Sequence, residues 1–487
     1  MTQVAEQAET LRRTGATVLA LGASELLGKV ATFLTVLVMA RLLGVADFGL
    51  LSFGLSLGLL LSVLSGLGLD ARVIQLGSAR PALLDRCYGA LVGIRVAVSG
   101  AVLAATAAVL SATMTPHEAV VVTLLVASCL LDTVTDASRA ACAARQRQQL
   151  SALVLVLQRF SVLVLCAGML LATRSAVDGA VGYLLGTAIG VLGMQVAARR
   201  AGARMRIRGS GAEARLVLRA APVTGLGDIA AMGVFRIDAA LIGVLLGTTA
   251  VGIYGAGYRV FESILFVSWT LSRAFVPVIA SRPDDARHLR DWAERGLVLA
   301  CAVYLPYGVV IALRGDDLVA LLFGEQYVHP GVLLGLAAAP LLFGITHVCA
   351  SVLLALRPDP VVLVASVLAL TVNIAMNLLL VPRWGITAAA VATTTAFLVE
   401  SVVLGIALSR IAGRFCRLRP LAALVPGAVV AGIVVELVDD VALAVPAGAL
   451  GFLLAWAAAG RVLDPVLFGN VVAFLRHRPR GAGMMGA

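Results

Sequence analysis

The chain has 487 residues, of which 60% are hydrophobic and 13% charged, and its net charge is +11. In a soluble protein this charge would suggest nucleic-acid binding. No basic run here is interleaved with aromatic residues or lies in a polar module, so nucleic acid is excluded as a partner. Residues 1–15 are polar and the first apolar stretch has full spanning length, so we expect no cleavable signal peptide. The composition predicts an all-α, polytopic integral membrane protein.

Fourteen apolar stretches follow one another, most of them long enough for the roughly 20-residue helix that crosses a bilayer. The expected spans are 16–40, 49–70, 88–110, 118–136, 150–173, 178–198, 216–247, 251–281, 296–313, 331–356, 360–382, 385–410, 420–438 and 441–460.

Basic residues alternate between the loops and fix the expected orientation. Four lie in the outer loops: Arg41, Arg174, Arg314 and Arg383. Six lie inside spans: Lys29, Arg95, Arg159, Arg236, Arg259 and Arg273. The other 28 of the 38 Lys and Arg residues lie on the opposite side. Because positive loops stay inside, this predicts that both termini are in the cytoplasm and that the protein resides in the cytoplasmic membrane.

No catalytic chemistry is apparent. The seven cysteines are scattered without a CxxC pair, and the five histidines are dispersed, only His347 within a span. We therefore expect no metal site, no cofactor, no disulfide and no enzymatic activity.

A short motif occurs twice. Leu42-Leu43-Gly44 is followed by Gly49, and 203 residues later Leu245-Leu246-Gly247 is followed by Gly252. Six spans separate the copies, which predicts a parallel repeat of two six-helix lobes followed by two further helices. The expected division is an N-lobe at 1–198, a basic cytoplasmic linker at 199–219, a C-lobe at 220–410, two helices at 411–464 and a cytoplasmic tail at 465–487.

The linker has seven arginines against one acid, Glu213. A segment of this kind is typical of an anchor at the inner leaflet, where it contacts anionic headgroups, so membrane lipids are expected partners.

Several blocks, spread in order over roughly the first 400 residues, carry a resemblance. They are Gly28-Lys29, Ala40-Arg41-Leu42-Leu43-Gly44 with Phe48-Gly49, Arg236-Ile237-Asp238, Val251-Gly252-Ile253-Tyr254-Gly255-Ala256-Gly257-Tyr258-Arg259, Leu322-Phe323-Gly324-Glu325-Gln326-Tyr327, and Asn373 and Asn377 leading to Val381-Pro382-Arg383-Trp384-Gly385-Ile386-Thr387-Ala388-Ala389. With them the chain resembles the polysaccharide-transporter (O-antigen-type) flippases of the multidrug/oligosaccharidyl-lipid/polysaccharide exporter superfamily. Thr387 departs from the family, which usually has a second glycine there.

The resemblance implies a V-shaped bundle of two lobes around a hydrophilic cavity. Its substrate would be a lipid-diphosphate-linked oligosaccharide, moved to the outer leaflet by alternating access. A lipid II flippase or a cation-coupled drug antiporter of the same superfamily remains an alternative. A polytopic glycan polymerase or ligase is a further one, but its chemistry needs a large outer loop, and the longest one expected here is near Arg314–Pro330.

A charge at mid-bilayer costs about 2.5–3.5 kcal/mol and needs a partner, water or a route to the headgroups. The residues Arg95, Arg159, Arg236 and Arg273 have no carboxylate three or four positions away on their own helices. They suggest a cationic cavity suited to a diphosphate, and snorkelling to the headgroups is the alternative. Lys29 and Arg259 either pair with Glu25 and Glu262 along their helices or bind the ligand too.

Four acids are candidates for coupling to H⁺ or Na⁺: Asp132, Asp136, Asp228 and Glu400. Asp136 has an alternative role, because Arg139 lies three residues on. Asn373 and Asn377 share a helix face, which favours hydrogen bonds between helices over contact with sugar.

The arginine distribution makes the topology testable. Reporter fusions after Arg147, Gly209 and Arg414 should give cytoplasmic signals, and fusions at Thr248 and Gly324 should give external ones. A reversed signal at any of these fusion sites would contradict the fourteen-span arrangement.

Overall fold

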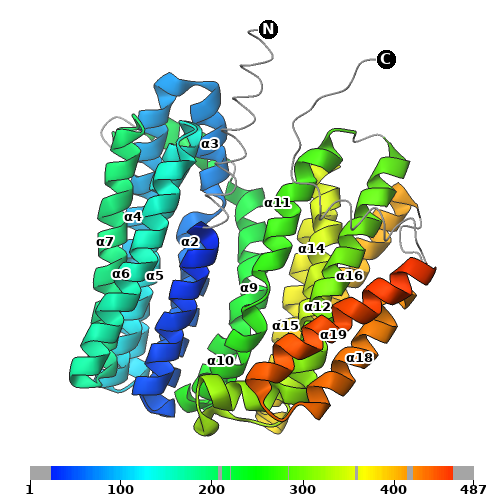
Figure 1. Ribbon diagram of the computed structural model, residues 1–487. Coiled ribbons are helices and arrows are strands. Elements are labelled where there is room, and N and C mark those ends of the chain that lie inside the picture. The colour runs from blue at the N-terminus through cyan, green and yellow to red at the C-terminus, as the bar shows by residue number, and fades with distance from the viewer. Residues whose placement is uncertain are drawn as a thin grey trace. The chain divides into compact units, whose positions relative to one another are not determined.

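The computed structural model describes residues 24–206, 211–219, 221–282, 285–356, 360–413 and 421–463, apart from the side chains of 221–224, 273, 274 and 277. Within these ranges the chain is helical, with turns and short connections and no strand. Figure 1 shows the helices. Twelve of them are long and apolar enough to cross a membrane. The prediction of an all-helical, multi-pass membrane protein is confirmed.

The helices follow one another in chain order. The first covers residues 24–42. Then come α2 (Val45–Gly66), α3 (Leu69–Ala79), η1 (Pro81–Leu83), α4 (Leu84–Thr113), α5 (Pro116–Ala144), α6 (Gln148–Thr173), α7 (Ala176–Arg200), α8 (Gly211–Leu218), α9 (Ala221–Leu246), α10 (Thr248–Glu262), α11 (Phe266–Ala280), α12 (Ala286–Leu322), η2 (Glu325–Tyr327), α13 (Val332–Leu336), α14 (Ala339–Leu356), α15 (Pro360–Trp384), α16 (Ile386–Ala412), α18 (Leu424–Leu437) and α19 (Val441–Leu463).

The twelve candidate spans correspond to the second to twelfth and the fourteenth of the predicted spans. The first predicted span, 16–40, is described only from residue 24 onward. The thirteenth, predicted at 420–438, contains α18, a helix of 14 residues. At 1.5 Å per residue such a helix is about 21 Å long, shorter than a hydrocarbon core of about 30 Å.

The span predicted at 251–281 corresponds to the candidate span Thr248–Ser272, but its helix is interrupted, because a turn at 263–265 separates α10 from α11. Two tyrosines of α12 bind the backbone groups that this break exposes. The Tyr307 hydroxyl donates to the Val260 carbonyl. The Tyr304 hydroxyl accepts from the Ser268 backbone N–H at 3.0 Å. A break inside a membrane is tolerated when neighbouring side chains satisfy the freed groups in this way.

Helix α12 is also longer than predicted. It starts after Asp285, whose carboxylate accepts the backbone N–H groups of His288 and Arg287 at 3.1 and 2.9 Å. These hydrogen bonds lower the pKa of Asp285, the one from His288 most. Arg314, predicted in an outer loop, is a non-helical residue inside α12. Its guanidinium donates to the carbonyls of Val435 and Val438 at 3.2 and 3.0 Å, which caps the end of α18.

Contacts divide the chain into two compact units, which are described separately. Among the described residues, the N-unit comprises 24–256 with 377–383, and the C-unit comprises 257–376 and 384–463. In the N-unit α2, α4, α6 and α7 surround α5, and α9 packs against α2 although the sequence assigned it to the second lobe. In the C-unit α12 and α14 pack against each other, α14 also packs against α11 and α16, and the α18–α19 pair packs on α12.

The two copies of the repeated motif meet inside the N-unit, where the starts of α2 and α10 lie backbone against backbone. A Cβ atom on Gly49 would lie 3.0 Å from the Gly252 nitrogen and still closer to the Thr248 carbonyl. A Cβ atom on Gly252 would lie 2.6 Å from the Val45 carbonyl oxygen. Only glycine fits at both positions.

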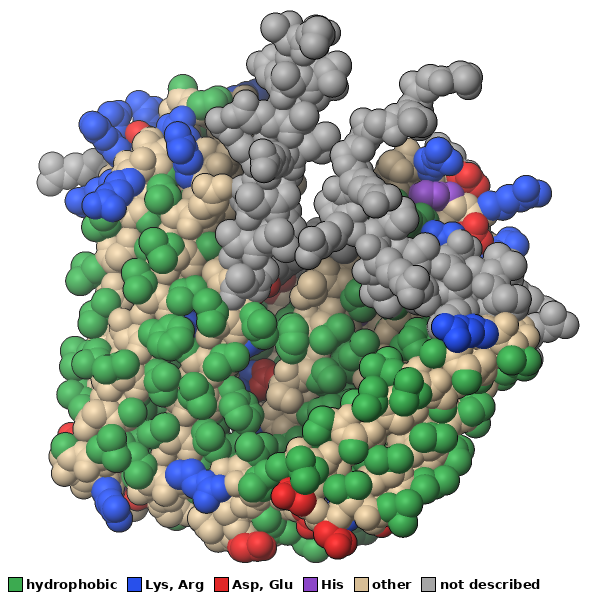
Figure 2. All heavy atoms as spheres, viewed as in Figure 1, with side chains coloured by type: hydrophobic (Ala, Val, Ile, Leu, Met, Phe, Trp, Pro, Cys, Tyr) green, Lys and Arg blue, Asp and Glu red, His purple; other side chains and the backbone are tan. Residues whose placement is uncertain are grey.

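The outer faces of the helices are apolar. Figure 2 shows hydrophobic side chains along the sides of α6, α7 and α19, and arginines gathered at one end of the N-unit helices. Leu157 and Val164 on α6 and Leu192 on α7 are 55%, 65% and 67% exposed. Exposed apolar surface of this extent is what lipid requires.

The basic linker is held against the N-unit. The Arg204 backbone N–H donates to the Asp85 carboxylate at 2.9 Å, and Arg86 pairs with Glu213 of α8 at 3.4 Å. Val217 of α8 is fully buried, and α8 packs on α3 and α4. The linker therefore has a folded contact in addition to the lipid contact that its charge predicts.

The Gly49 contact gives a stability prediction. Gly49→Ala should lower the stability of the purified protein by about 1–3 kcal/mol, because two backbones must separate to admit one methyl group. Thermal unfolding in detergent measures this. Gly168→Ala is the matched control, since nothing lies within 4 Å of its Cβ position. Equal midpoints for the two variants would contradict the close contact.

Candidate functional site

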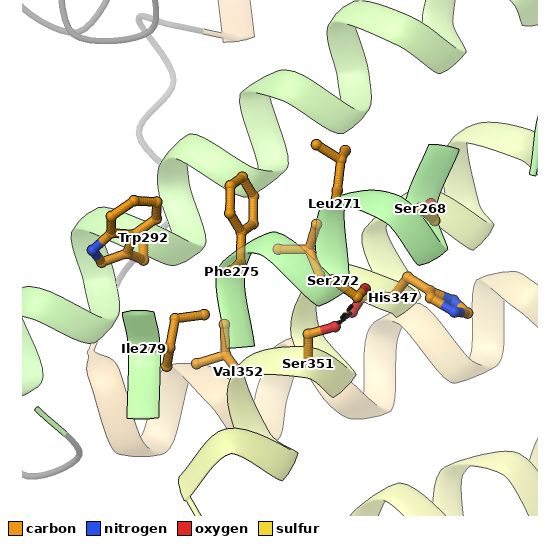
Figure 3. Close-up of a pocket in the computed structure, with 10 residues that line it drawn as sticks. Ser268, Leu271, Ser272, Phe275, Ile279, Trp292, His347, Ser351 and Val352 are labelled. Carbon is orange, nitrogen blue, oxygen red and sulfur yellow. Dashed lines mark hydrogen bonds between the residues drawn. The ribbon is translucent and has the colours of Figure 1, made fainter. Parts of the chain in front are cut away.

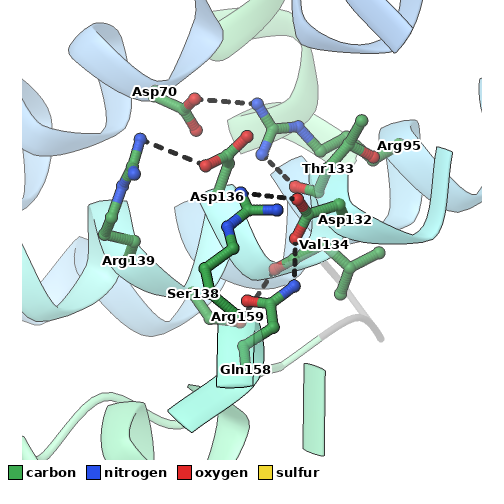
Figure 4. A network of polar contacts seen from close by, with 10 residues as sticks. All are labelled: Asp70, Arg95, Asp132, Thr133, Val134, Asp136, Ser138, Arg139, Gln158 and Arg159. Carbon is green, nitrogen blue, oxygen red and sulfur yellow. Dashed lines mark hydrogen bonds and ion pairs between the residues drawn. The ribbon is translucent and has the colours of Figure 1, made fainter. Parts of the chain in front are cut away.

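A network of charged side chains lies among α3, α4, α5 and α6 of the N-unit (Figure 4). It contains two of the arginines that sequence reasoning placed in a cationic cavity, Arg95 and Arg159. It also contains two of the candidate coupling acids, Asp132 and Asp136. The structure brings these four together, and it gives each arginine a carboxylate from a different helix.

Arg95 is the enclosed member of the network. Its side chain is 2% exposed, one terminal nitrogen donates to Asp70 of α3 at 2.9 Å, and the other donates to the Thr133 carbonyl of α5. The guanidinium thus joins three helices. Helical spacing could not predict this contact, because Asp70 is 25 residues away in the chain.

Arg159 is the accessible member. Its guanidinium lies 3.4 Å from Asp132, and the two side chains are 31% and 28% exposed. The second carboxylate oxygen of Asp132 accepts from the Gln158 amide at 2.7 Å. Arg159 lies eleven residues after the start of α6, about 16 Å along the helix, so the pair is near the middle of this 26-residue apolar helix.

Asp136 forms an ion pair with Arg139 at 3.1 Å, three residues on. The alternative role that the sequence left open for Asp136 is therefore confirmed. Both side chains are more than 40% exposed. Asp136 also interacts electrostatically with Asp132, Asp70 and Arg95, so the ion pairs form one network.

The other cationic candidates lie elsewhere. Arg259 pairs with Glu262 at 2.9 Å within the C-unit, as one of its two predicted roles required. Lys29 is exposed on the helix at 24–42, and Arg236 is half-buried on α9. Arg273 is part of α11, but its side chain lies outside the described residues.

The remaining candidate acids are also separate from one another. Asp228 of α9 interacts electrostatically with Asp70 of α3. Glu400 of α16 belongs to the C-unit, is 8% exposed and accepts from the Ser366 hydroxyl at 2.6 Å.

Sequence reasoning missed a buried acid, Asp238. Its side chain is 1% exposed. The carboxylate accepts a hydrogen bond from the Tyr254 hydroxyl of α10 and another from the Ala239 backbone N–H, the latter at 2.9 Å. The signal was present, because an acid in an apolar span requires a donor.

The C-unit contains a small pocket between α11, α12 and α14 (Figure 3). Phe275 and Trp292 line its apolar part, and His347, Ser272 and Ser351 line its polar part. The two serine hydroxyls lie 2.7 Å apart. None of the described side chains that line the pocket is an acid, a lysine or an arginine.

Comparison with known proteins identifies a matching family and several relatives. The model of a family described as polysaccharide biosynthesis protein matches residues 38–330. The probable flippase AglR of Haloferax volcanii is 25% identical over 184 residues, which are 37% of this chain and 38% of that protein. The probable low-salt glycan biosynthesis flippase Agl15 of the same organism is 24% identical over 170 residues, 34% and 36% of the two chains. The chain thus spans little more than a third of these relatives' lengths.

Solved structures show the same fold. The lipid II flippase MurJ in an inward closed conformation matches with a TM-score of 0.76 and 12% identity, over 91% of this chain and 99% of that one. An inward-facing multidrug resistance transporter of the MATE family matches with a TM-score of 0.65 and 12% identity, over 80% and 95%. The family match covers more than half of the 487 residues. The chain therefore belongs to the polysaccharide biosynthesis protein family and has the fold of the multidrug/oligosaccharidyl-lipid/polysaccharide exporter superfamily.

Proposed function

We propose that the protein is a flippase, not an enzyme, and that it moves a lipid-diphosphate-linked oligosaccharide precursor across the cytoplasmic membrane by alternating access. The observation that carries the proposal is the family membership over residues 38–330. The named flippases among its relatives support the reaction class. The substrate chemistry is argued from the intramembrane arginines.

The guanidinium of arginine is a planar fork of N–H donors, so it can bind two oxygens of a diphosphate at once. The two arginines Arg159 and Arg95 of the N-unit network differ in how well they can bind an anion. Arg159 is about a third exposed and has one carboxylate contact, so its guanidinium can reach a ligand. Arg95 is enclosed by Asp70 and Thr133, so we assign it a structural role. Arg236, Arg259, Arg273 and Lys29 remain proposed ligand contacts.

The proposal includes the topology. Fourteen spans with both termini in the cytoplasm follow from the arginine distribution, with lobes at 1–198 and 220–410. It also includes a coupling ion, H⁺ or Na⁺, for which Asp132, Asp136, Asp228 and Glu400 are the candidates. Acids inside a membrane are the usual carriers of such ions.

Arg236 tests the substrate chemistry. Arg236→Ala should fold and insert but fail to export glycan, because an apolar replacement relieves insertion cost and removes the anion contact. Arg236→Lys should keep partial export, since it retains the charge and loses the fork. Glycan export in cells lacking the native gene measures this, with membrane levels of each variant determined in parallel.

Arg410→Ala is the matched control for Arg236, because Arg410 lies in the last turn of α16. It should export at the wild-type rate. Wild-type export by Arg236→Ala would exclude Arg236 as a ligand contact.

Arg95 tests the division of roles. Asp70→Asn leaves a 2%-exposed guanidinium without its carboxylate and should cost about 3–5 kcal/mol of stability. Arg95→Met leaves the Asp70 carboxylate without its arginine, but Asp70 is 34% exposed and stays hydrated. This variant should therefore lose less stability than Asp70→Asn. Unfolding of the purified variants in detergent measures both. Equal costs, or none for Asp70→Asn, would contradict the structural assignment.

A further inference from the structure

The two ion pairs of the N-unit network differ in a way that bears on ligand binding. Arg95 has two acceptors and almost no exposed surface, whereas Arg159 has one carboxylate contact at 3.4 Å and is 31% exposed. An ion pair that retains solvent contributes little stability, so a stronger ligand can displace one partner. A diphosphate offers such a ligand, because its charge exceeds that of one carboxylate.

Gln158 is placed to hold Asp132 when Arg159 leaves. It is 1% exposed, and its amide N–H donates to Asp132 at 2.7 Å. Its position is confined by α7, because a Cβ atom on Gly190 would lie 2.7 Å from the Gln158 Cβ and closer still to the atoms beyond it. Asp132 therefore stays in place while the longer arginine side chain moves.

The amide oxygen of Gln158 is a hydrogen-bond acceptor that is not in use. Its Oε1 is buried and has no hydrogen-bond partner within the part of the chain that the structure describes. A carboxylic acid needs an acceptor for its O–H, whereas a carboxylate needs donors. Rotation of the amide by half a turn presents Oε1 to Asp132, so the same side chain serves both protonation states.

Resting on the proposed function, we propose that Asp132 and Arg159 form an exchangeable ion pair that links diphosphate binding to proton uptake. The ligand takes the Arg159 guanidinium from Asp132. Asp132 then takes one proton from water and donates its O–H to Gln158. The proton returns to water when the ligand leaves and the pair re-forms. A bare carboxylate beside a diphosphate in a low-dielectric site would otherwise repel the ligand.

The charged and titratable groups that face this pair come from several helices. They are Cys129 and Asp136 on α5 and Tyr183 on α7. Cys129 in turn interacts with Arg236 on α9, and Asp136 interacts with Asp70 on α3, Arg95 on α4 and Arg139 on α5. The helix at 24–42, which carries Lys29, packs beside Arg159 at Gly28. Asp136 already has Arg139 as a partner, and Asp70 has Arg95. Asp132 is thus the carboxylate whose partner the ligand removes.

The test is calorimetric binding of farnesyl diphosphate to the purified full-length protein in detergent. Measurements in two buffers of different protonation enthalpy, at several pH values, give the protons taken up per ligand. Wild type should take up as much as one proton more than Asp132→Asn, which lacks the titrating group. For each unit that the pH rises, the affinity of wild type should fall by up to tenfold more than the affinity of Asp132→Asn falls.

The variants have opposite expected effects. Asp132→Asn should bind at least about fivefold more tightly, because Arg159 no longer has a competing carboxylate. Arg159→Gln should bind at least about fivefold more weakly. Gln158→Met should retain binding but take up less of the proton, since the O–H then lacks its acceptor. Arg95→Met is the matched control and should keep the wild-type proton count.

Three outcomes would overturn the exchange: the same affinity and proton count in Asp132→Asn as in wild type, a changed proton count in Arg95→Met alone, or no binding by either wild type or Asp132→Asn. Glycan export separates this from the proposed function. Normal export by wild type together with any of these outcomes removes the exchange and leaves the flippase. Absence of export in cells that make the precursor removes the flippase itself.

Discussion

The structure depends on one constraint, the cost of placing a charge in hydrocarbon. Each described arginine of the N-unit network has a carboxylate at 2.9 to 3.4 Å. Two of these three ion pairs join helices, α3 to α4 and α5 to α6, so the polar network is also a connection between helices whose outer faces are apolar. In lipid, apolar contact between helices gains little, because the lipid tails are equally apolar. Hydrogen-bonded charge pairs and close glycine contacts therefore contribute more to the arrangement than they would in water.

The same constraint separates the two kinds of arginine. Arg95 is enclosed, and each of its two terminal nitrogens has an acceptor on another helix, as in a structural bridge. Arg159 keeps a third of its surface and has a single partner. The sequence treats the two alike, because both lie in apolar helices with no nearby carboxylate. What distinguishes them is the packing around each guanidinium, which decides whether a ligand can approach.

This difference marks how far sequence reasoning reaches. Pairs within a helix, such as Asp136 with Arg139 and Arg259 with Glu262, follow from the 3.6-residue period and were foreseen. The helical type of the spans, and the places of twelve of the fourteen predicted ones, follow from hydropathy in the same local way. The Arg95–Asp70 and Arg159–Asp132 pairs were not foreseen, because the register between neighbouring helices is set by side-chain packing along their whole length. The break between α10 and α11 was missed for the same reason, since the tyrosines that stabilise it lie on α12.

That break has a consequence for the order in which the chain is made. Each half, α10 or α11, has 15 residues and is about 22 Å long, too short to cross the membrane alone. The hydroxyls that satisfy the exposed backbone belong to Tyr304 and Tyr307, which leave the ribosome only after both halves have been synthesised. Until then the local hydrogen bonds available to these groups are those from Ser263 to the Val260 carbonyl and from the Ser268 N–H to the Leu265 carbonyl. Residues 248–322 thus form a single unit of insertion, in which the last helix completes the first two.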